Sequence, residues 1–105
     1  MPTDYAVVQA KLAAIEAEMK RSGFWQNTPL KPEQYQFEQA FAMDTMVYSQ
    51  WLQFIFVPRV QTIIDQRRQF PRQSMVGAQA VREFDGVPEA SELTRLLTEF
   101  DALFG

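Results

Sequence analysis

The chain of 105 residues carries ten basic and thirteen acidic side chains, has a formal net charge of −3, and contains neither cysteine nor histidine. This length is typical of one domain, which we assign to residues 1–105, and it allows burial of about 65% of the unfolded surface without a metal or disulfide. The absence of histidine and cysteine excludes a proton shuttle that works at neutral pH, a thiol nucleophile and the commonest metal ligands. We therefore expect no catalytic residue, no metal and no cofactor.

The sequence predicts a soluble cytoplasmic protein. Its first residues lack the basic, apolar and small-residue order of a signal peptide. The longest apolar run, residues 54–57, is far shorter than the roughly 20 residues that a membrane span needs. The acidic pI of about 4.9 disfavours general attraction to nucleic acid or acidic lipid, so another protein is the preferred partner.

The first predicted helix has one narrow apolar seam. Thr3 or Asp4 can cap its start, and Gly23 ends it. Apolar residues recur at alternating spacings of three and four, which is the period of a core-facing helix: Tyr5, Val8, Leu12, Ile15 and Met19.

Residues 23–44 show no sustained period. A connection of this length is either a functional loop with a ligand site or an ordered cover over the core. We favour the cover, because exposed apolar clusters are uncommon and this segment carries several aromatic residues: Phe24, Trp25, Tyr35, Phe37 and Phe41.

A long second helix is predicted from Asp44 or Thr45 to Arg68, with Asp44 as its N-cap. Its apolar face is broad, which places it at the centre of the fold. Pro58 lies inside it, cannot donate to the carbonyl of Phe54, and is expected to bend the helix. The apolar face consists of Trp51, Leu52, Ile55, Phe56, Val60, Ile63 and Ile64.

Two further helices complete the prediction. Ser74 can cap a short helix over 75–84, although Gly77 weakens that assignment, and a clear apolar seam indicates a helix over 89–104. The inward residues of the short helix are Val76, Ala80, Val81 and Phe84, and those of the last helix are Leu93, Leu96, Leu97, Phe100, Leu103 and Phe104. The fold class is therefore all-α, a compact four-helix bundle with a long central helix bent at Pro58.

Four short motifs resemble the YqcC-like family of small bacterial proteins. They are Met43-Asp44-Thr45-Met46, Trp51-Leu52-Gln53, Pro58-Arg59 and Asp101-Ala102-Leu103-Phe104, and their order and spacing match across nearly the whole chain except residues 72–86. The resemblance implies a four-helix bundle without an established activity, cofactor or catalytic residue. Family members are encoded beside a tRNA pseudouridine synthase in some bacteria, so the resemblance implies at most an association with that enzyme.

Two functional interpretations follow. The preferred one is a non-catalytic protein-interaction or accessory module, and the alternative is an RNA-associated helper of a tRNA-modifying enzyme. A modest arginine cluster favours the alternative, while the same arginines could simply stabilise the negative ends of helices. The cluster consists of Arg59, Arg67, Arg68, Arg72 and Arg82.

Arg59 is the residue on which these interpretations diverge. As a structural residue it would form an ion pair with Asp101 or Glu99 and hold the last helix at the proline bend. As a binding residue it would be exposed and meet an anionic group of a partner, with Tyr48 or Trp51 as an anchor. We favour the structural role, and expect Met43, Met46 and Met75 to pack in the core.

Overall fold

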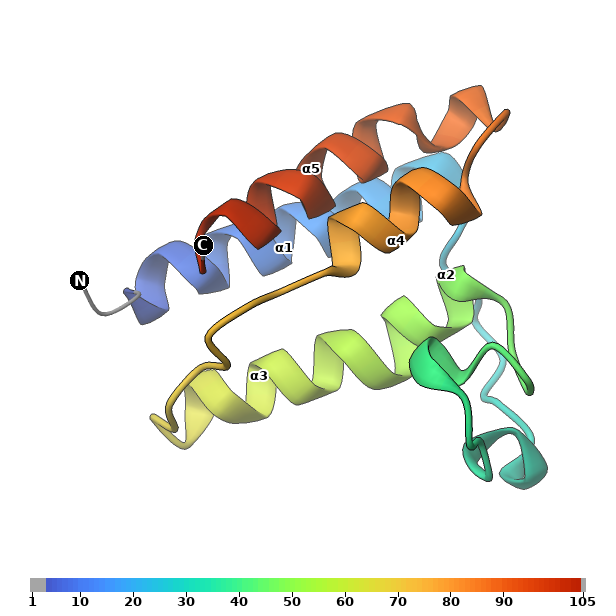
Figure 1. Ribbon diagram of the computed structural model, residues 1–105, viewed down its shortest axis with the longest axis horizontal. Helices are drawn as coiled ribbons and strands as arrows, with labels where there is room; N and C mark the ends of the chain where they lie inside the picture. Colours follow the sequence, from blue (N-terminus) through green and yellow to red (C-terminus); the bar gives the residue numbers. More distant parts are fainter. Residues whose placement is uncertain (1–3, 105) are drawn as a thin grey trace.

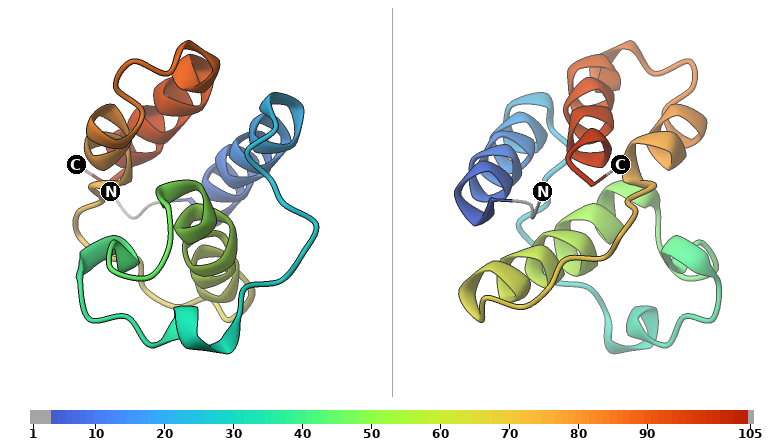
Figure 2. Two further views of the ribbon diagram at one scale, coloured as in Figure 1. Left: turned by 90° about the vertical axis from the view of Figure 1, so that its right-hand side faces the viewer. Right: turned by 60° about the vertical axis from the view of Figure 1, so that its left-hand side comes forward.

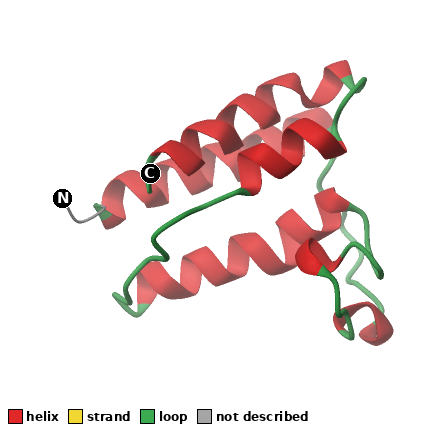
Figure 3. Ribbon diagram, viewed as in Figure 1, coloured by secondary structure: helices red, strands yellow, loops and turns green. Residues whose placement is uncertain are grey.

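The computed structural model describes residues 4–104, and all regular structure in that range is helical (Figures 1 and 3). This confirms the all-α class, whereas the geometry of a regular four-helix bundle stays a prediction. The helical segments in chain order are α1 (Tyr5–Ser22), the 3-10 turns η1 (Pro32–Tyr35) and η2 (Ala40–Ala42), the continuous helix of α2 (Tyr48–Trp51), η3 (Leu52–Phe56) and α3 (Val57–Asp65), then α4 (Val76–Glu83), η4 (Pro88–Ala90) and α5 (Ser91–Ala102).

Neighbouring helices run antiparallel around one core (Figures 1 and 2). α5 lies between α1 and α4, and α3 packs on α1. The largest fully buried side chains come from α1, η3 and α5, so the first, second and last helices share the core. They are Val8, Leu12, Ile15, Met19, Leu52, Leu93 and Leu97.

α1 forms as its sequence pattern predicts. Asp4 caps it by accepting a 2.8 Å hydrogen bond from the backbone N–H of Ala6, and Gly23 ends it in the left-handed conformation at φ 84°. A left-handed residue at this position favours glycine, which has no Cβ to clash with the backbone. Thr3, the other predicted cap, lies outside the described residues.

The second helix begins later than predicted. Val47 precedes its first turn, and its backbone N–H donates to the side-chain oxygen of Gln50 at 3.1 Å. Asp44 is not the cap: its carboxylate accepts the backbone N–H groups of Glu38 and Gln39 at 3.0 and 3.4 Å. These hydrogen bonds, that from Glu38 foremost, lower the pKa of Asp44. The carboxylate therefore closes the preceding loop instead of starting the helix.

The helix continues through Pro58 with a wider turn just before it. In η3 the backbone N–H of Val57 donates to the carbonyl of Leu52, five residues back, which is a π-helical bond. Such a turn is one of the local irregularities that accommodate a residue unable to donate its own backbone hydrogen bond. The helix thus stays continuous through Pro58, and a bend of the helix axis there stays a prediction.

Residues 23–47 cover the core at the end where α1 finishes and α2 begins (Figure 1). Four of their predicted aromatic residues are partly buried against it, and Tyr35 is exposed. The side-chain amide of Gln53 holds this cover, because it accepts from the backbone N–H of Gln26 at 2.9 Å and donates to its carbonyl at 2.7 Å. The hydroxyl of Thr45 adds a 2.7 Å bond to the carbonyl of Gln34.

α4 packs on α5 through Gly77. A Cβ at this position would lie 2.5 Å from the Cα of Thr98 and 2.6 Å from its backbone nitrogen, so only glycine allows this approach. The residue that weakened the helix prediction is therefore required by tertiary packing. Val81, predicted to face inward, is 58% exposed because α4 presents its Val76 and Ala80 side to the core.

Candidate functional site

Tyr48 and Trp51, the predicted anchors for a partner, are part of the core. They are 4% and 7% exposed, with stacked rings 5.6 Å apart, and the hydroxyl of Tyr48 donates to the carbonyl of Val76 at 2.6 Å. Burial raises the pKa of this hydroxyl. Both side chains are buried, because the segment 23–47 and α4 cover this side of the helix, and a role of either in binding a partner stays a prediction.

The predicted internal ion pair of Arg59 is also absent from residues 4–104, where Arg59 is exposed. Asp101 accepts hydrogen bonds from the Ser74 hydroxyl and from three backbone N–H groups at the start of α4, at 2.6–3.2 Å. Glu99 instead pairs with Lys11 at 2.6 Å and with Arg95. Both carboxylates are engaged elsewhere, so Arg59 faces solvent. Asp101 nevertheless joins α5 to α4.

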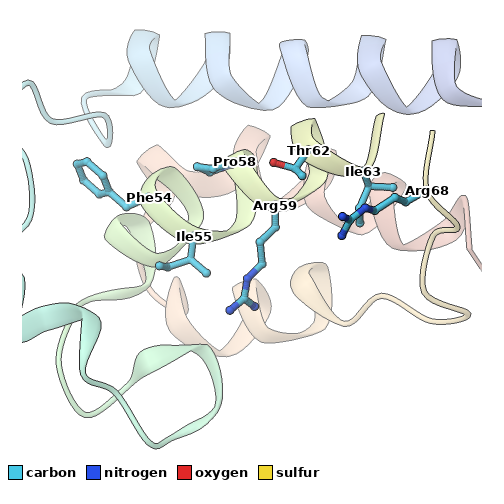
Figure 4. A pocket seen from close by; sticks show the side chains of 7 residues that line it. All are labelled: Phe54, Ile55, Pro58, Arg59, Thr62, Ile63 and Arg68. Atoms are coloured by element: carbon cyan, nitrogen blue, oxygen red, sulfur yellow. The ribbon is translucent and has the colours of Figure 1, made fainter. Parts of the chain in front are cut away.

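A shallow groove follows the outer side of the helix formed by η3 and α3. Six of its seven residues form two rows with a spacing of four, which places the members of each row above one another along the helix. The seventh, Arg68, follows the end of α3. Figure 4 shows Ile63 between Arg59 and Arg68 along the helix. The groove encloses about 450 Å³ and is lined by Phe54, Ile55, Pro58, Arg59, Thr62, Ile63 and Arg68. Its walls are mainly apolar, with two guanidinium groups and, within the described part of the chain, no carboxylate.

A second, deeper hollow adjoins this groove and shares Arg59 and Ile63 with it. It encloses about 240 Å³ between α3, the connecting segment 66–75 and the end of α5. Five of its lining residues are aromatic, and their rings form a continuous series with centroids 5.0–5.8 Å apart. In order of contact these are Trp51, Phe56, Phe100, Phe104 and Phe70.

Charge is unevenly distributed along the chain. Residues 45–82 carry five arginines and one carboxylate, Asp65, for a net charge of +4, and the remaining residues carry five basic and twelve acidic side chains, for −7. All five arginines are exposed, which both interpretations of the cluster allow, and Arg82 lies apart on α4. Arg67 stands 5.1 Å over the ring of Tyr5. The groove is thus a basic site on an acidic protein.

The hollow depends on residues that the sequence assigned only to the core or to a loop. Phe100 and Phe104 belong to the last apolar seam, and Phe70 falls in an unassigned connection. The spacing of Ile55, Arg59 and Ile63 by four residues was the available signal for a mixed apolar and basic stripe.

Only one of the three methionines predicted to pack in the core is buried there. Met46 is buried, but Met43 and Met75 are 51% and 56% exposed, so the prediction that they lie in the core is wrong for both. Met43 follows the left-handed residues of η2 and meets the side-chain amide of Gln79 at 3.8 Å. Met75 precedes α4, where its side chain lies beside the hollow.

Neither a metal site nor a membrane-spanning helix is found among residues 4–104. The described carboxylates form no group of three or more suited to a metal ion. None of the described helices combines the length and apolarity required to cross a bilayer.

Comparison with known proteins places the chain in a family. Residues 7–103 match the family model DUF446, which is described as tRNA pseudouridine synthase C. The chain is 31% identical to the uncharacterised protein YqcC of Escherichia coli, over 97% of this chain and 94% of that protein. An uncharacterised protein of Haemophilus influenzae is 30% identical over 88% of this chain and 84% of its own length.

The fold and one partial match add to this assignment. The solution structure of E. coli YqcC superposes with a TM-score of 0.85 at 29% identity, covering 97% of this chain and 88% of that one. A protein of Pectobacterium carotovorum named tRNA pseudouridine synthase C is 35% identical over 62% of this chain, but only over 17% of its own length.

Proposed function

The chain belongs to the DUF446 family of YqcC-like proteins, and on this premise we propose that it is a non-catalytic protein-interaction or accessory module of the bacterial cytosol. The observation that carries the proposal is the basic, apolar groove on α3. Arg59 is exposed there without an ion-pair partner among residues 4–104, and the neighbouring hollow is walled by aromatic rings. Buried aromatic anchors with arginine nearby are typical of protein interfaces.

The proposed absence of catalysis rests on the state of the ionisable side chains. The chain has no histidine or cysteine. Among the described carboxylates, Glu18, Glu92 and Glu99 bind arginine or lysine, and Asp101 caps α4. A general acid or base must be free to exchange its proton with a substrate, and these four groups are committed to structural bonds. The other described carboxylates form no group of three or more that could hold a metal ion.

A second candidate function is an RNA-associated helper of a tRNA-modifying pseudouridine synthase. The observation that favours it is the stretch of similar sequence inside the larger protein named tRNA pseudouridine synthase C. Occurrence of a similar segment within an enzyme and as a separate chain is consistent with association between the two. The exposed arginines of α3 and the segment 66–75 would then meet phosphate groups.

Pro58 has a role in this proposal. It lines the groove directly before Arg59 and follows the π-helical turn of η3. We propose that it bends the helix axis, so that the half around Trp51 follows the core while the half around Ile63 presents the groove.

The decisive experiment is a titration of the purified chain into the tRNA pseudouridine synthase C of the same bacterium, followed by calorimetry and by size-exclusion chromatography. Both proteins are treated with ribonuclease beforehand. A stoichiometric complex that persists without RNA, and that the double variant Arg59→Glu, Arg68→Glu weakens at least tenfold, supports the protein-interaction module.

The matched control is Arg82→Glu, which removes another exposed arginine, on α4. Equal weakening by this control would point to overall charge and not to the groove. A complex that forms only when tRNA is present would support the RNA-associated helper. If the two proteins do not associate under either condition, an accessory role toward this enzyme is wrong.

A further inference from the structure

We propose that the groove and the hollow together bind an acidic segment of a partner protein, which inserts one large apolar side chain between α3 and the segment 66–75. This inference rests on the proposed function as a protein-interaction module and specifies the chemistry of the partner. The hollow would hold the apolar side chain, and Arg59 and Arg68 would contact carboxylates on either side of it.

The volume of the hollow selects a single side chain. Pockets for drug-sized ligands and cofactors usually enclose about 300–1,000 Å³, whereas an apolar cavity of about 150 Å³ accepts benzene. At about 240 Å³ the hollow is too small for most cofactors but accommodates one aromatic or branched aliphatic group. The series of five rings offers the edges and faces that such a side chain prefers to contact.

The charges select an acidic partner. Arg59 lies on the boundary shared by the groove and the hollow, and Arg68 lines the groove from the connection that follows the end of α3. Among residues 4–104, no carboxylate lines either space. A segment that carried lysine or arginine here would meet like charges, whereas aspartate or glutamate would form charge-assisted hydrogen bonds.

The backbone at the end of α3 supports a functional placement of Arg68. Arg67 adopts the left-handed conformation at φ 52°, which is unfavourable for a residue other than glycine. This turn lets the N–H of Arg68 bond the carbonyl of Ile63 at 2.9 Å, and the Tyr5 hydroxyl binds the carbonyl of Arg68 at 2.7 Å. Strained residues held by surrounding contacts concentrate at binding sites.

The test uses a synthetic heptapeptide with a central phenylalanine flanked by glutamates, titrated into the isotope-labelled chain. The indole signal of Trp51 is followed by nuclear magnetic resonance, and is assigned by the absence of the other indole signal in Trp25→Phe. We expect saturable shifts of the Trp51 signal and of the 66–75 amides. Replacing the peptide's phenylalanine by alanine, or its glutamates by lysines, should weaken binding at least tenfold, about 1.4 kcal/mol.

Variants of the chain locate the site. Arg59→Glu should weaken peptide binding at least tenfold, whereas Arg82→Glu should change it less than twofold. Ile63→Phe enlarges a side chain at the shared boundary and should block entry, while Val81→Phe adds the same ring on exposed α4. Melting curves of all four variants verify folding, and Arg59→Glu, at an exposed position, keeps the test decisive if Ile63→Phe unfolds.

Four outcomes would overturn the inference. These are the absence of Trp51 shifts, equal loss with Arg82→Glu, binding of a single-stranded RNA oligonucleotide in place of the peptide, and occupation of the hollow by a second copy at high concentration. The result is separable from the proposed function. Peptide binding without a synthase complex would leave this inference standing and refute that partner, whereas a ribonuclease-resistant synthase complex insensitive to Ile63→Phe would do the reverse.

Discussion

Between α4 and α5 the backbones approach so closely that a methyl group at Gly77 would lie 2.5 Å from the Cα of Thr98, whereas the outer side of α3 borders a groove and a hollow. The polar groups differ in the same way. Asp101 is bonded to four donors at the start of α4, and Arg59 has no ion pair within the described chain.

This comparison separates residues that stabilise the fold from residues that remain available to bind a partner. A carboxylate that satisfies several backbone N–H groups contributes to stability and has little capacity for a partner. An exposed guanidinium contributes little to stability and retains all its donors. The two regions should therefore respond oppositely to substitution, in stability for the first and in binding for the second.

The largest effect is expected for Gly77→Ala. Alanine favours an exposed helix interior by about 1 kcal/mol over glycine, but here its methyl group would meet backbone atoms of Thr98 and Leu97 within 2.8 Å. We expect a loss of about 3 kcal/mol in the free energy of unfolding, measured by urea denaturation. Ala78→Gly at the neighbouring exposed position should lose only about 1 kcal/mol. A neutral Gly77→Ala would contradict the closeness of the two helices.

Asp101→Ala should have the next largest effect. It removes the acceptor of the Ser74 hydroxyl and of the backbone N–H groups of Val76, Gly77 and Ala78. Loss of such a cap typically destabilises by about 0.5–2 kcal/mol, and the number of donors places this one near 2 kcal/mol. Ser74→Ala, which removes one donor, serves as the graded control and should lose less than half as much. Hydrogen exchange should show the loss concentrated in α4.

Gln53→Ala tests the hydrogen bonds that attach the cover, residues 23–47, to the second helix. It leaves the N–H and carbonyl of Gln26 without their partner in a partly buried site. We expect a loss of about 1–2 kcal/mol and faster proteolysis within residues 23–47. Gln26→Ala, which removes the side-chain bonds of Gln26 to Gln50 and Thr28 but keeps its backbone bonds to Gln53, is the matched control. Unchanged proteolysis would show that aromatic packing alone holds the cover.

Acidification should weaken both the cover and the contact between α1 and α5. The hydrogen bond from Lys11 foremost lowers the pKa of Glu99, and the backbone N–H of Glu38 foremost lowers that of Asp44. Because these folded-state pKa values lie below the unfolded ones, their stabilisation is present above about pH 4.5 and is lost as the pH falls through the folded values. Glu99→Gln and Asp44→Asn should each flatten the acid limb of a stability–pH curve. A curve unchanged in both variants would contradict these bonds.

The smallest effect on stability is expected for Arg59→Ala. Its guanidinium is exposed and makes no ion pair within residues 4–104, so the melting temperature should not change measurably. Combined with Asp101→Ala, its effect should be additive, since the two side chains do not share a bond. A coupling above about 0.5 kcal/mol would restore the internal pair and remove Arg59 from the proposed binding surface.

The sequence by itself determined the helices, the seam of α1 and the apolar residues of α5. Periodicity suffices for these, because a helix must turn one stripe toward the core whatever element covers it. It also indicated the arginine cluster. The absence of histidine and cysteine excluded an imidazole proton shuttle and a thiol nucleophile.

Only the tertiary structure decided how the individual polar and aromatic residues are used. Asp44 and Asp101 look alike in sequence, but one closes a loop and the other caps a helix twenty-five residues before it, and neither role follows from local spacing. Tyr48 and Trp51 are buried, and Arg59 is left exposed, by elements far away in the chain. Burial and pairing depend on which surfaces meet in space, whereas helical periodicity depends on neighbours within two turns.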